Sequence, residues 1–350
     1  MWKFYQNKKV LVTGHTGFKG TWLCWLLSAL GADVYGYALP SQSGCLYELA
    51  RPPIVGEVLA DIRNRVTVQE TLTRFQPDLV FHLAAHAYIN GSYEYPADIF
   101  EINIMGTVGL LEAIRSSGQI IPTVVVTSDK CYARGLNRRP CRETDPFGAA
   151  EAYSTSKACQ DLAAQSYQRS FPEMSIATAR ASNMIGGGDF NETRLIPHLL
   201  SCFASGKQAY LRNPDFIRPW QYVLDVLWGY LTLGKALAEG NLADDASFNF
   251  GPTPDGFQTV GQVAELLATH FPDAQYEMQN SDSSNEIEIL KLDSSKAWET
   301  LGWQPLYTLE ETLAQTAAFQ KGIGCVTPAW LCREQVKQYM DRIENVEKQL

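Results

Sequence analysis

The sequence lacks long apolar runs and clustered basic charge. No segment approaches the ~18–20 consecutive apolar residues that a membrane-spanning helix needs, and the apolar run that starts at Val10 is broken by Gly14. The net charge is −9 and no block of lysine or arginine occurs, which argues against nucleic-acid binding. We therefore expect a cytoplasmic, globular protein with neither a membrane nor a nucleic acid as partner.

Metal-binding and disulfide patterns are also missing. The eight cysteines form no CxxC pair and no Cys/His metal spacing, so we expect reduced thiols, a reducing compartment and no metal site. Cys131 follows an apolar run and is the one candidate nucleophile among them. Because no histidine base is near it in sequence, a packed structural cysteine is the favoured interpretation.

A dinucleotide-binding pattern is present near the N-terminus. Residues 9–13 are rich in β-branched side chains, a glycine turn follows, and residues 21–30 form an apolar helical pattern. Glycines in such a turn let the backbone approach a pyrophosphate, and the helix N-terminus supplies N–H donors. The candidate cofactor contacts here are Gly14, Thr16, Gly17, Phe18 and Gly20.

The centre of the chain carries residues suited to proton transfer. Residues 124–127 are typical of a buried strand, and Ser128 follows them directly. Tyr153 and Lys157 are four residues apart, so on a helix they share one face. We predict that the Lys157 ammonium lowers the pKa of Tyr153 and that Ser128 holds the substrate oxygen whose proton Tyr153 removes.

Three features follow one another along the chain: the glycine turn, the strand that ends before Ser128, and the Tyr153–Lys157 pair. This order resembles that of the extended short-chain dehydrogenase/reductase superfamily. The run Ser128-Asp129-Lys130 resembles that of the nucleotide-sugar 4,6-dehydratases, and the lysine after the aspartate is similar to the CDP-glucose 4,6-dehydratase subgroup. The resemblance covers about residues 8–321 and implies NAD as cofactor.

The resemblance also assigns further cofactor contacts. It implies that Asp61 meets the adenine amino group beside Ile62, that Ala84 and Ala85 leave room for the cofactor, and that Asn103 ties the sheet together behind it. Tyr153 and Lys157 belong to the cofactor site as well. Two departures stand out: Ala38-Leu39-Pro40 replaces the acidic residue that usually binds the adenosine ribose, and His86 replaces a glutamine.

Substrate contacts are expected from the segments that follow the sixth strand. Arginine offers bidentate donors to phosphate, and an aromatic ring can stack on a base. His82, inside a strand, is instead predicted to be structural. The candidate substrate-binding residues are His86, Asn183, Arg194, Leu195, Arg212, Arg218 and Trp220.

The predicted fold class is α/β: a doubly wound, parallel, Rossmann-type sheet with a smaller discontinuous C-terminal substrate domain. Residues 1–183 plus about 224–252 are expected to bind NAD, and residues 184–223 and 253–350 a nucleotide-diphosphate sugar. We further expect a homodimer or higher homo-oligomer, as extended short-chain enzymes typically pair through two helices. The apolar positions predicted for that contact are Ile104, Leu110, Leu111, Ile114 and Leu162.

The resemblance implies NAD-dependent 4,6-dehydration, a lyase reaction, with CDP-glucose as the leading substrate. Tyr153 would remove the C4 hydroxyl proton, Lys130 would assist removal of the C5 proton, and Asp129 would protonate the departing C6 oxygen. Three alternatives stay open: a nucleotide-sugar C4 epimerase, a 4,6-dehydratase for another nucleotide sugar, and a non-catalytic NAD- or nucleotide-binding protein.

Overall fold

A parallel β-sheet forms the centre of the molecule. The computed structural model describes residues 2–87, 94–133, 139–148, 151–242, 245–279 and 288–347, so the loop after Ala87 and residues 149–150 lie outside the described part. Within that part the main sheet has seven strands in the order β10-β6-β5-β4-β1-β2-β3, and every pairing is parallel. The strands are β1 (Lys9–Thr13), β2 (Asp33–Ala38), β3 (Gly56–Leu59), β4 (Leu79–His82), β5 (Thr123–Val126), β6 (Ile176–Ala181) and β10 (Ser247–Phe250).

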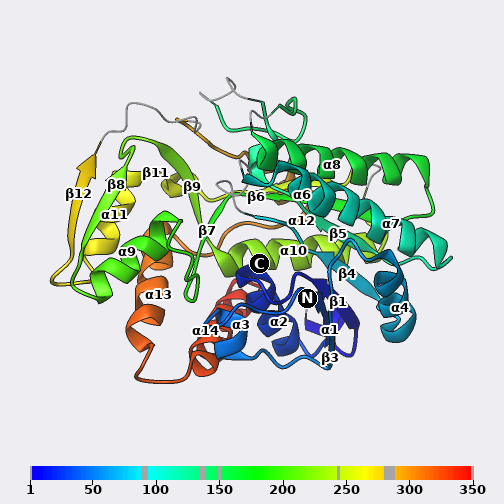
Figure 1. Cartoon of the computed structure of the whole chain (residues 1–350), viewed down its shortest axis with the longest axis horizontal. Helices are drawn as coiled ribbons and strands as arrows, with labels where there is room; N and C mark the ends of the chain where they lie inside the picture. The colour runs from blue at the N-terminus through cyan, green and yellow to red at the C-terminus, as the bar shows by residue number, and fades with distance from the viewer. Residues whose placement is uncertain are drawn as a thin grey trace.

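Helices cover both faces of this sheet (Figure 1). One face carries α2 (Phe18–Ala29), α10 (Val223–Ala238) and α14 (Pro328–Glu347), and the other α4 (Arg65–Phe75), α7 (Gly106–Ser116) and α8 (Ala152–Ser170). Because both faces are covered, the central strands β4 and β5 are buried along their whole length. The predicted doubly wound α/β fold is confirmed.

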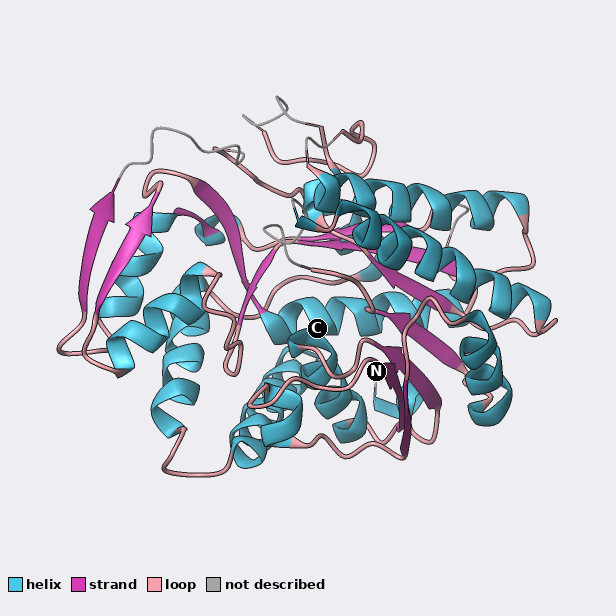
Figure 2. Cartoon of the chain, in the orientation of Figure 1, coloured by secondary structure: helices cyan, strands magenta, loops and turns pink. Residues whose placement is uncertain are grey.

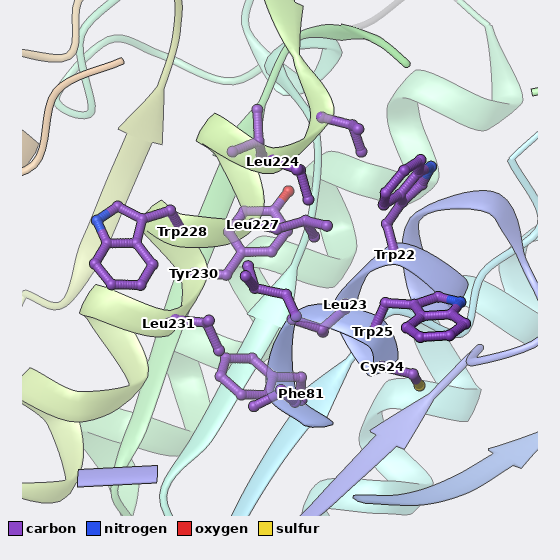
Figure 3. Close-up of a cluster of buried hydrophobic side chains, with 14 of the residues drawn as sticks. Trp22, Leu23, Cys24, Trp25, Phe81, Leu224, Leu227, Trp228, Tyr230 and Leu231 are labelled. Carbon is purple, nitrogen blue, oxygen red and sulfur yellow. The ribbon is translucent and has the colours of Figure 1, made fainter. Parts of the chain in front are cut away.

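The core on the α2 face positions the start of that helix. Trp22 and Leu23 of α2 pack with Leu227 and Tyr230 of α10 and with Phe81 of β4 (Figure 3). Trp22 also donates a hydrogen bond from Nε1 to the Gly187 carbonyl at 3.0 Å. The first turn of α2 is thereby held against the segment that leaves the sheet after β6.

A smaller unit with its own core lies beside the sheet, on the left of Figure 2. Two small sheets form part of it, in the orders β11-β9-β7 and β12-β8. Its elements are β7 (Asn183–Ile185), α9 (Leu195–Ala204), β8 (Gln208–Arg212), β9 (Ile217–Tyr222), β11 (Phe257–Thr259), α11 (Val260–Ala268), β12 (Gln275–Gln279) and α13 (Leu309–Gly322).

The remaining elements are short. They are α1 (Trp2–Tyr5), α3 (Leu46–Ala50), α6 (Pro96–Phe100), the π-helix η1 (Glu101–Met105), the 3₁₀ turns η2 (Asp129–Cys131) and η3 (Pro254–Gly256), and α12 (Ser295–Leu301). Among the described residues, no helix has the length and apolar content to cross a membrane.

A buried carboxylate attaches the C-terminal helix to the main unit. Asp225 of α10 is fully buried and accepts hydrogen bonds from the Leu306 N–H at 2.9 Å, the Tyr307 N–H at 3.2 Å and the Tyr339 hydroxyl at 2.9 Å. Helix α14 also packs on α2 and α3. The predicted domain boundaries stay a prediction, and we propose that α14 is counted with the sheet unit.

The predicted dimer contact is wrong for several of its residues. Leu110, Leu111 and Ile114 are at most 2% exposed, because α7 turns its apolar face to its own sheet. Leu162 of α8 is 51% exposed and Met105 of η1 is 46% exposed, so these two large apolar side chains remain available on that side of the protomer.

The oligomeric state stays a prediction that one substitution can test. If copies of the chain pair through the α8 surface, Leu162→Glu should convert the wild-type oligomer into a monomer, because the new carboxylate would lose its hydration on association. Light scattering coupled to gel filtration measures the mass. Val55→Glu, at a side chain 61% exposed before β3, is the matched control and should leave the mass unchanged. A monomeric wild type, or an oligomer insensitive to Leu162→Glu, would contradict the prediction.

Candidate active site

The glycine turn between β1 and α2 is built for close backbone contacts. Gly14 has φ +74°, and a Cβ there would lie 2.8 Å from the Ala84 nitrogen. A Cβ on Gly20 would lie 2.2 Å from the Gly14 carbonyl oxygen. Any larger residue at either position would force the turn open.

The glycine turn ends at the N-terminus of α2, where no side chain caps the backbone N–H groups. Gly17 is the exposed N-cap, and the first turn of the helix has no acidic residue. Free N–H groups and the positive end of the helix dipole favour an anion there. Thr16 Oγ1 donates to the Leu39 carbonyl at 3.1 Å and thus joins the turn to the end of β2, while Phe18 lies beside Gly186. These features fit a dinucleotide pyrophosphate.

The other predicted cofactor contacts differ in availability. Ala84 and Ala85 are half-buried directly after β4, beside Gly14. The Asp61 carboxylate pairs with Arg63 at 2.7 Å, and hydrogen bonds from Arg63 hold its pKa below the ordinary value. The Ile62 side chain is 6% exposed and packs where a Cβ on Gly106 would lie, and the cofactor contact of this residue stays a prediction.

Asn103 has a structural role. It is fully buried in η1, its Nδ2 donates to Ser156 Oγ at 2.8 Å and to the His86 carbonyl at 3.2 Å, and its Oδ1 accepts from the His86 N–H. These contacts agree with the tying role predicted for Asn103, and its place in the cofactor site stays a prediction. Asn103 ties the segment after β4 to α8.

The structure brings Ser128, Asp129 and Tyr153 together. Ser128 and Asp129 follow β5, where Ser128 Oγ donates to Asp129 Oδ1 at 3.0 Å and accepts from the Lys130 N–H at 3.2 Å. The Tyr153 hydroxyl, from the first turn of α8, hydrogen-bonds to Ser128. Asp129 is 2% exposed. Burial raises its pKa, and the positive charge of Lys130 opposes that effect.

Lys157 is placed differently from the prediction. Its Nζ donates to Gln160 Oε1 at 2.8 Å and to the Val126 carbonyl at 3.3 Å, and burial lowers its pKa to about 7. Burial, followed by the Asp129 charge, raises the pKa of Tyr153 to about 12. The net effect on Tyr153 is a raised pKa, because the loss of hydration dominates, and the predicted lowering by Lys157 stays a prediction.

A buried polar chain supports Lys157 from behind. Gln160 Nε2 donates to Thr107 Oγ1 at 2.8 Å, and His82 joins Thr107 at 2.9 Å to Thr13 at 2.7 Å. His82 is fully buried with both ring nitrogens hydrogen-bonded, which confirms the structural role predicted for it. The chain fixes the Lys157 side chain from three elements of the fold.

Arg194 and Arg218 approach the catalytic residues. Arg194, the N-cap of α9 before Leu195, pairs with Asp189 at 2.8 Å, and its charge acts on Tyr153. Arg218 is 9% exposed, and its charge acts on Asp129. Asn183 is half-buried, at the start of β7 next to β9. The charges of Arg194 and Arg218 thus reach the catalytic residues at the carboxyl end of β5, and Asn183 follows shortly after β6.

Two predicted substrate residues lie elsewhere. Trp220 is 5% exposed in the core of the smaller unit and donates from Nε1 to the Gln258 carbonyl at 3.0 Å, so base stacking by its ring is wrong. Arg212 is exposed at the end of β8, in a different small sheet from Arg218, and its substrate contact stays a prediction. His86 is half-buried, and burial lowers its pKa.

Lys19 is a site residue that the sequence reasoning missed. It lies in the first turn of α2, burial lowers its pKa to about 8, and its charge acts on both Asp129 and Lys157. Its position between Gly17 and Gly20 in the glycine turn was the sequence signal that could have identified it. Cys131 is fully buried and burial raises its pKa, which favours the packed cysteine over the nucleophile.

Replacing Lys157 should stabilise the protein while abolishing activity. The native lysine loses its proton near pH 7, whereas the unfolded one keeps it up to about 10.5, so wild-type stability rises with pH between these values. Lys157→Met should therefore raise the melting temperature most at about pH 6 and progressively less toward about pH 10. Thermal melts across this range give the measurement. Lys337→Met, at an exposed α14 position, is the control, and a destabilised Lys157→Met protein at about pH 6 would refute the expectation.

Solved structures share this architecture. The UDP-glucose 4-epimerase of Thermotoga maritima matches with a TM-score of 0.79 and 24% identity over 90% of this chain and 99% of its own. The dTDP-glucose 4,6-dehydratase of Bacillus anthracis, in complex with NAD, matches with a TM-score of 0.76 and 21% identity over 90% of this chain and 96% of its own. At these identities the likeness establishes the fold alone.

Sequence relatives narrow the family. A CDP-glucose 4,6-dehydratase of Salmonella typhimurium is 38% identical over 91% of this chain and 92% of its own length. A dTDP-glucose 4,6-dehydratase of Xanthomonas campestris is 26% identical over 87% of this chain and 91% of its own length. The family model described as GDP-mannose 4,6 dehydratase matches residues 11–316, which include the glycine turn, Ser128 to Lys130 and Tyr153. The chain therefore belongs to the nucleotide-sugar 4,6-dehydratases, NAD-dependent hydro-lyases of the short-chain dehydrogenase/reductase superfamily.

Proposed function

We propose that this protein converts CDP-glucose to CDP-4-keto-6-deoxyglucose by removing one water. The observation that carries the proposal is the Ser128-Asp129-Lys130 turn at the end of β5, facing Tyr153. The 38% identity to a protein named CDP-glucose 4,6-dehydratase supports the choice of nucleotide and sugar.

The cofactor site is proposed at the glycine turn. Gly14, Gly17 and Gly20 would cradle the pyrophosphate at the open start of α2, with Ala84 and Ala85 beside it. A bound NAD would supply the hydride chemistry between C4 and C6 of the sugar. Asp61 stays a proposed contact for the adenine.

Tyr153 is proposed as the base that receives the C4 hydroxyl proton. It acts as a base only as the phenolate, and its pKa of about 12 makes that form costly in the structure described. Positive charge nearby lowers this cost. Lys157, one helical turn away and with its amine held by Gln160, is proposed to supply that charge when protonated.

Asp129 and Lys130 are proposed to carry out the elimination. Because burial raises the pKa of Asp129, the carboxyl group can retain a proton for the departing C6 oxygen. Lys130 is half-buried next to it and would remove the C5 proton, which the C4 ketone makes acidic. Two neighbouring residues thus supply the acid and the base of one step.

Substrate binding is proposed between the two units. Arg194 and Arg218 would pair with the diphosphate, and Asn183 and His86 would contact the sugar side of the crevice. Arg212 stays a proposed contact for the nucleotide. We also propose a cytoplasmic location, since all eight cysteines are free thiols.

A nucleotide-sugar C4 epimerase is the second candidate. The fold likeness to UDP-glucose 4-epimerase favours it, and Ser128, Tyr153 and Lys157 would serve either reaction. An epimerase has no evident need for an acid and an amine directly behind the serine. The Asp129-Lys130 pair therefore supports dehydration.

A panel of nucleotide sugars tests the proposed function. CDP-glucose incubated with the NAD-loaded protein should yield a product lighter by one water, with the alkaline absorbance of a 4-keto sugar. Mass spectrometry on CDP-, dTDP-, GDP- and UDP-hexoses measures the preference. Products of unchanged mass would establish epimerisation, and no change in any sugar would indicate a non-catalytic protein.

Two substitutions should separate the half-reactions. Tyr153→Phe removes the first base and should lower the formation of any 4-keto species by about 10²–10⁴-fold. Lys130→Met should retain oxidation at C4 but slow exchange of the C5 hydrogen with solvent deuterium, read by mass spectrometry. Lys337→Met on α14 is the matched control. Deuterium incorporation at C5 by the Lys130→Met protein at the wild-type rate would disprove the role of Lys130.

A further inference from the structure

The proposed dehydration leaves two residues in the wrong protonation state. C4 is oxidised from alcohol to ketone and C6 is reduced from hydroxymethyl to methyl, so no external oxidant is consumed. Lys130 takes the C5 proton and later gives a proton, exchangeable with solvent, back to C5, so its own protonation state is restored. The C4 hydroxyl proton stays on Tyr153, whereas the water that leaves carries a proton from Asp129. After each turnover Tyr153 therefore holds one proton too many and Asp129 one too few.

The geometry around Ser128 connects these two residues. Ser128 Oγ hydrogen-bonds to the Tyr153 hydroxyl and donates its own proton to Asp129 Oδ1 at 3.0 Å. A serine hydroxyl has one proton to donate and two lone pairs that accept. The hydrogen bond with Ser128 lowers the pKa of Tyr153, so the Ser128 hydroxyl can also donate to the phenolate form of Tyr153. Ser128 thus lies between the two groups, and its single hydroxyl can give a proton to one of them while a lone pair accepts a proton from the other.

Bulk water has little access to the acid. Asp129 is 2% exposed and Ser128 is 7% exposed. The second carboxylate oxygen, Asp129 Oδ2, is buried and has no hydrogen-bond partner within the described residues. Among the described contacts, the hydrogen bond from Ser128 therefore gives this carboxylate a direct connection through which a proton can arrive.

We propose that the Ser128 hydroxyl returns one proton from Tyr153 to Asp129 after each turnover. Ser128 gives its proton to Asp129 Oδ1 and takes the Tyr153 proton, so one O–H bond breaks and one forms at each step. The result is the phenolate and the carboxylic acid that the next cycle requires. The inference rests on the proposed dehydration, and it makes Ser128 a proton relay in addition to a contact for the C4 oxygen.

The electrostatics of the pair favour a shared negative charge. The Asp129 charge raises the pKa of Tyr153, so a proton on Asp129 makes the phenolate easier to form. Burial of both groups disfavours two negative charges at once. The relay moves one charge from the carboxylate to the phenolate and keeps the total constant.

Tyr230 offers a matched control within the same region. Its hydroxyl, visible in Figure 3, is fully buried, and its α10 position places it where the charges of Asp129 and Tyr153 act on it. No hydrogen bond joins Tyr230 to either residue among the contacts of the described chain. Tyr230→Phe thus removes a nearby hydroxyl that is outside the relay.

Rapid-quench kinetics with NAD-loaded protein and excess CDP-glucose test the relay. Ser128→Ala should form up to one product per site in a first phase and then slow by at least about tenfold, because Asp129 is reprotonated only by slow exchange with solvent. Added imidazole, a small proton carrier, should accelerate the second phase alone. Wild type, Ser128→Thr and Tyr230→Phe should each proceed without a burst.

Other outcomes overturn the relay. If Ser128→Ala slows the first and later turnovers by the same factor, Ser128 only positions the C4 hydroxyl. A second phase insensitive to imidazole would assign the delay to product release, and a burst in Tyr230→Phe would place the proton path elsewhere. If the wild type forms no dehydrated product from any nucleotide sugar, the proposed function itself fails, which is a distinguishable result.

Discussion

The Asp161 carboxylate is the contact on which the catalytic geometry depends. It is fully buried in α8 and pairs with Arg180 of β6 at 2.8 Å, while Thr127 donates to it at 2.8 Å. Thr127 immediately precedes Ser128, and Asp161 lies one helical turn beyond Lys157. A buried ion pair gives little net stability, because the loss of hydration offsets the attraction between the charges. Separating the two charges inside the protein is costly, so packing arrangements that break the pair are disfavoured. Here it fixes the distance between the end of β5 and the helix that carries Tyr153.

The sequence predicted the parts of the site that depend on local pattern. A β-branched run, closely spaced glycines and an apolar helix leave few other folds for residues 9–30, and the structure has β1, the turn and α2 there. Ser128 at the end of β5 and Tyr153 at the start of α8 followed from strand and helix periodicity in the same way. Each of these features is decided within about twenty residues of chain.

The errors came from tertiary packing, which local pattern does not encode. An apolar side chain on a helix can pack on the sheet of its own chain or on a second copy, and the sequence pattern does not distinguish the two. Leu110, Leu111 and Ile114 pack on the sheet. The aromatic ring of Trp220 could stack on a base, yet the side chains packed around it bury it in the core of the smaller unit.

The attachment of α14 through Asp225 has a consequence for biosynthesis. The core around Trp22, Trp25 and Leu26 includes Leu331, Val336 and Tyr339, so α2, which is made early, is covered by α14, which is made late. Domains usually fold in order as the ribosome releases them. This one must keep part of the α2 surface uncovered until more than three hundred residues have been made, which makes the nascent chain a natural client for chaperones that shield apolar surface.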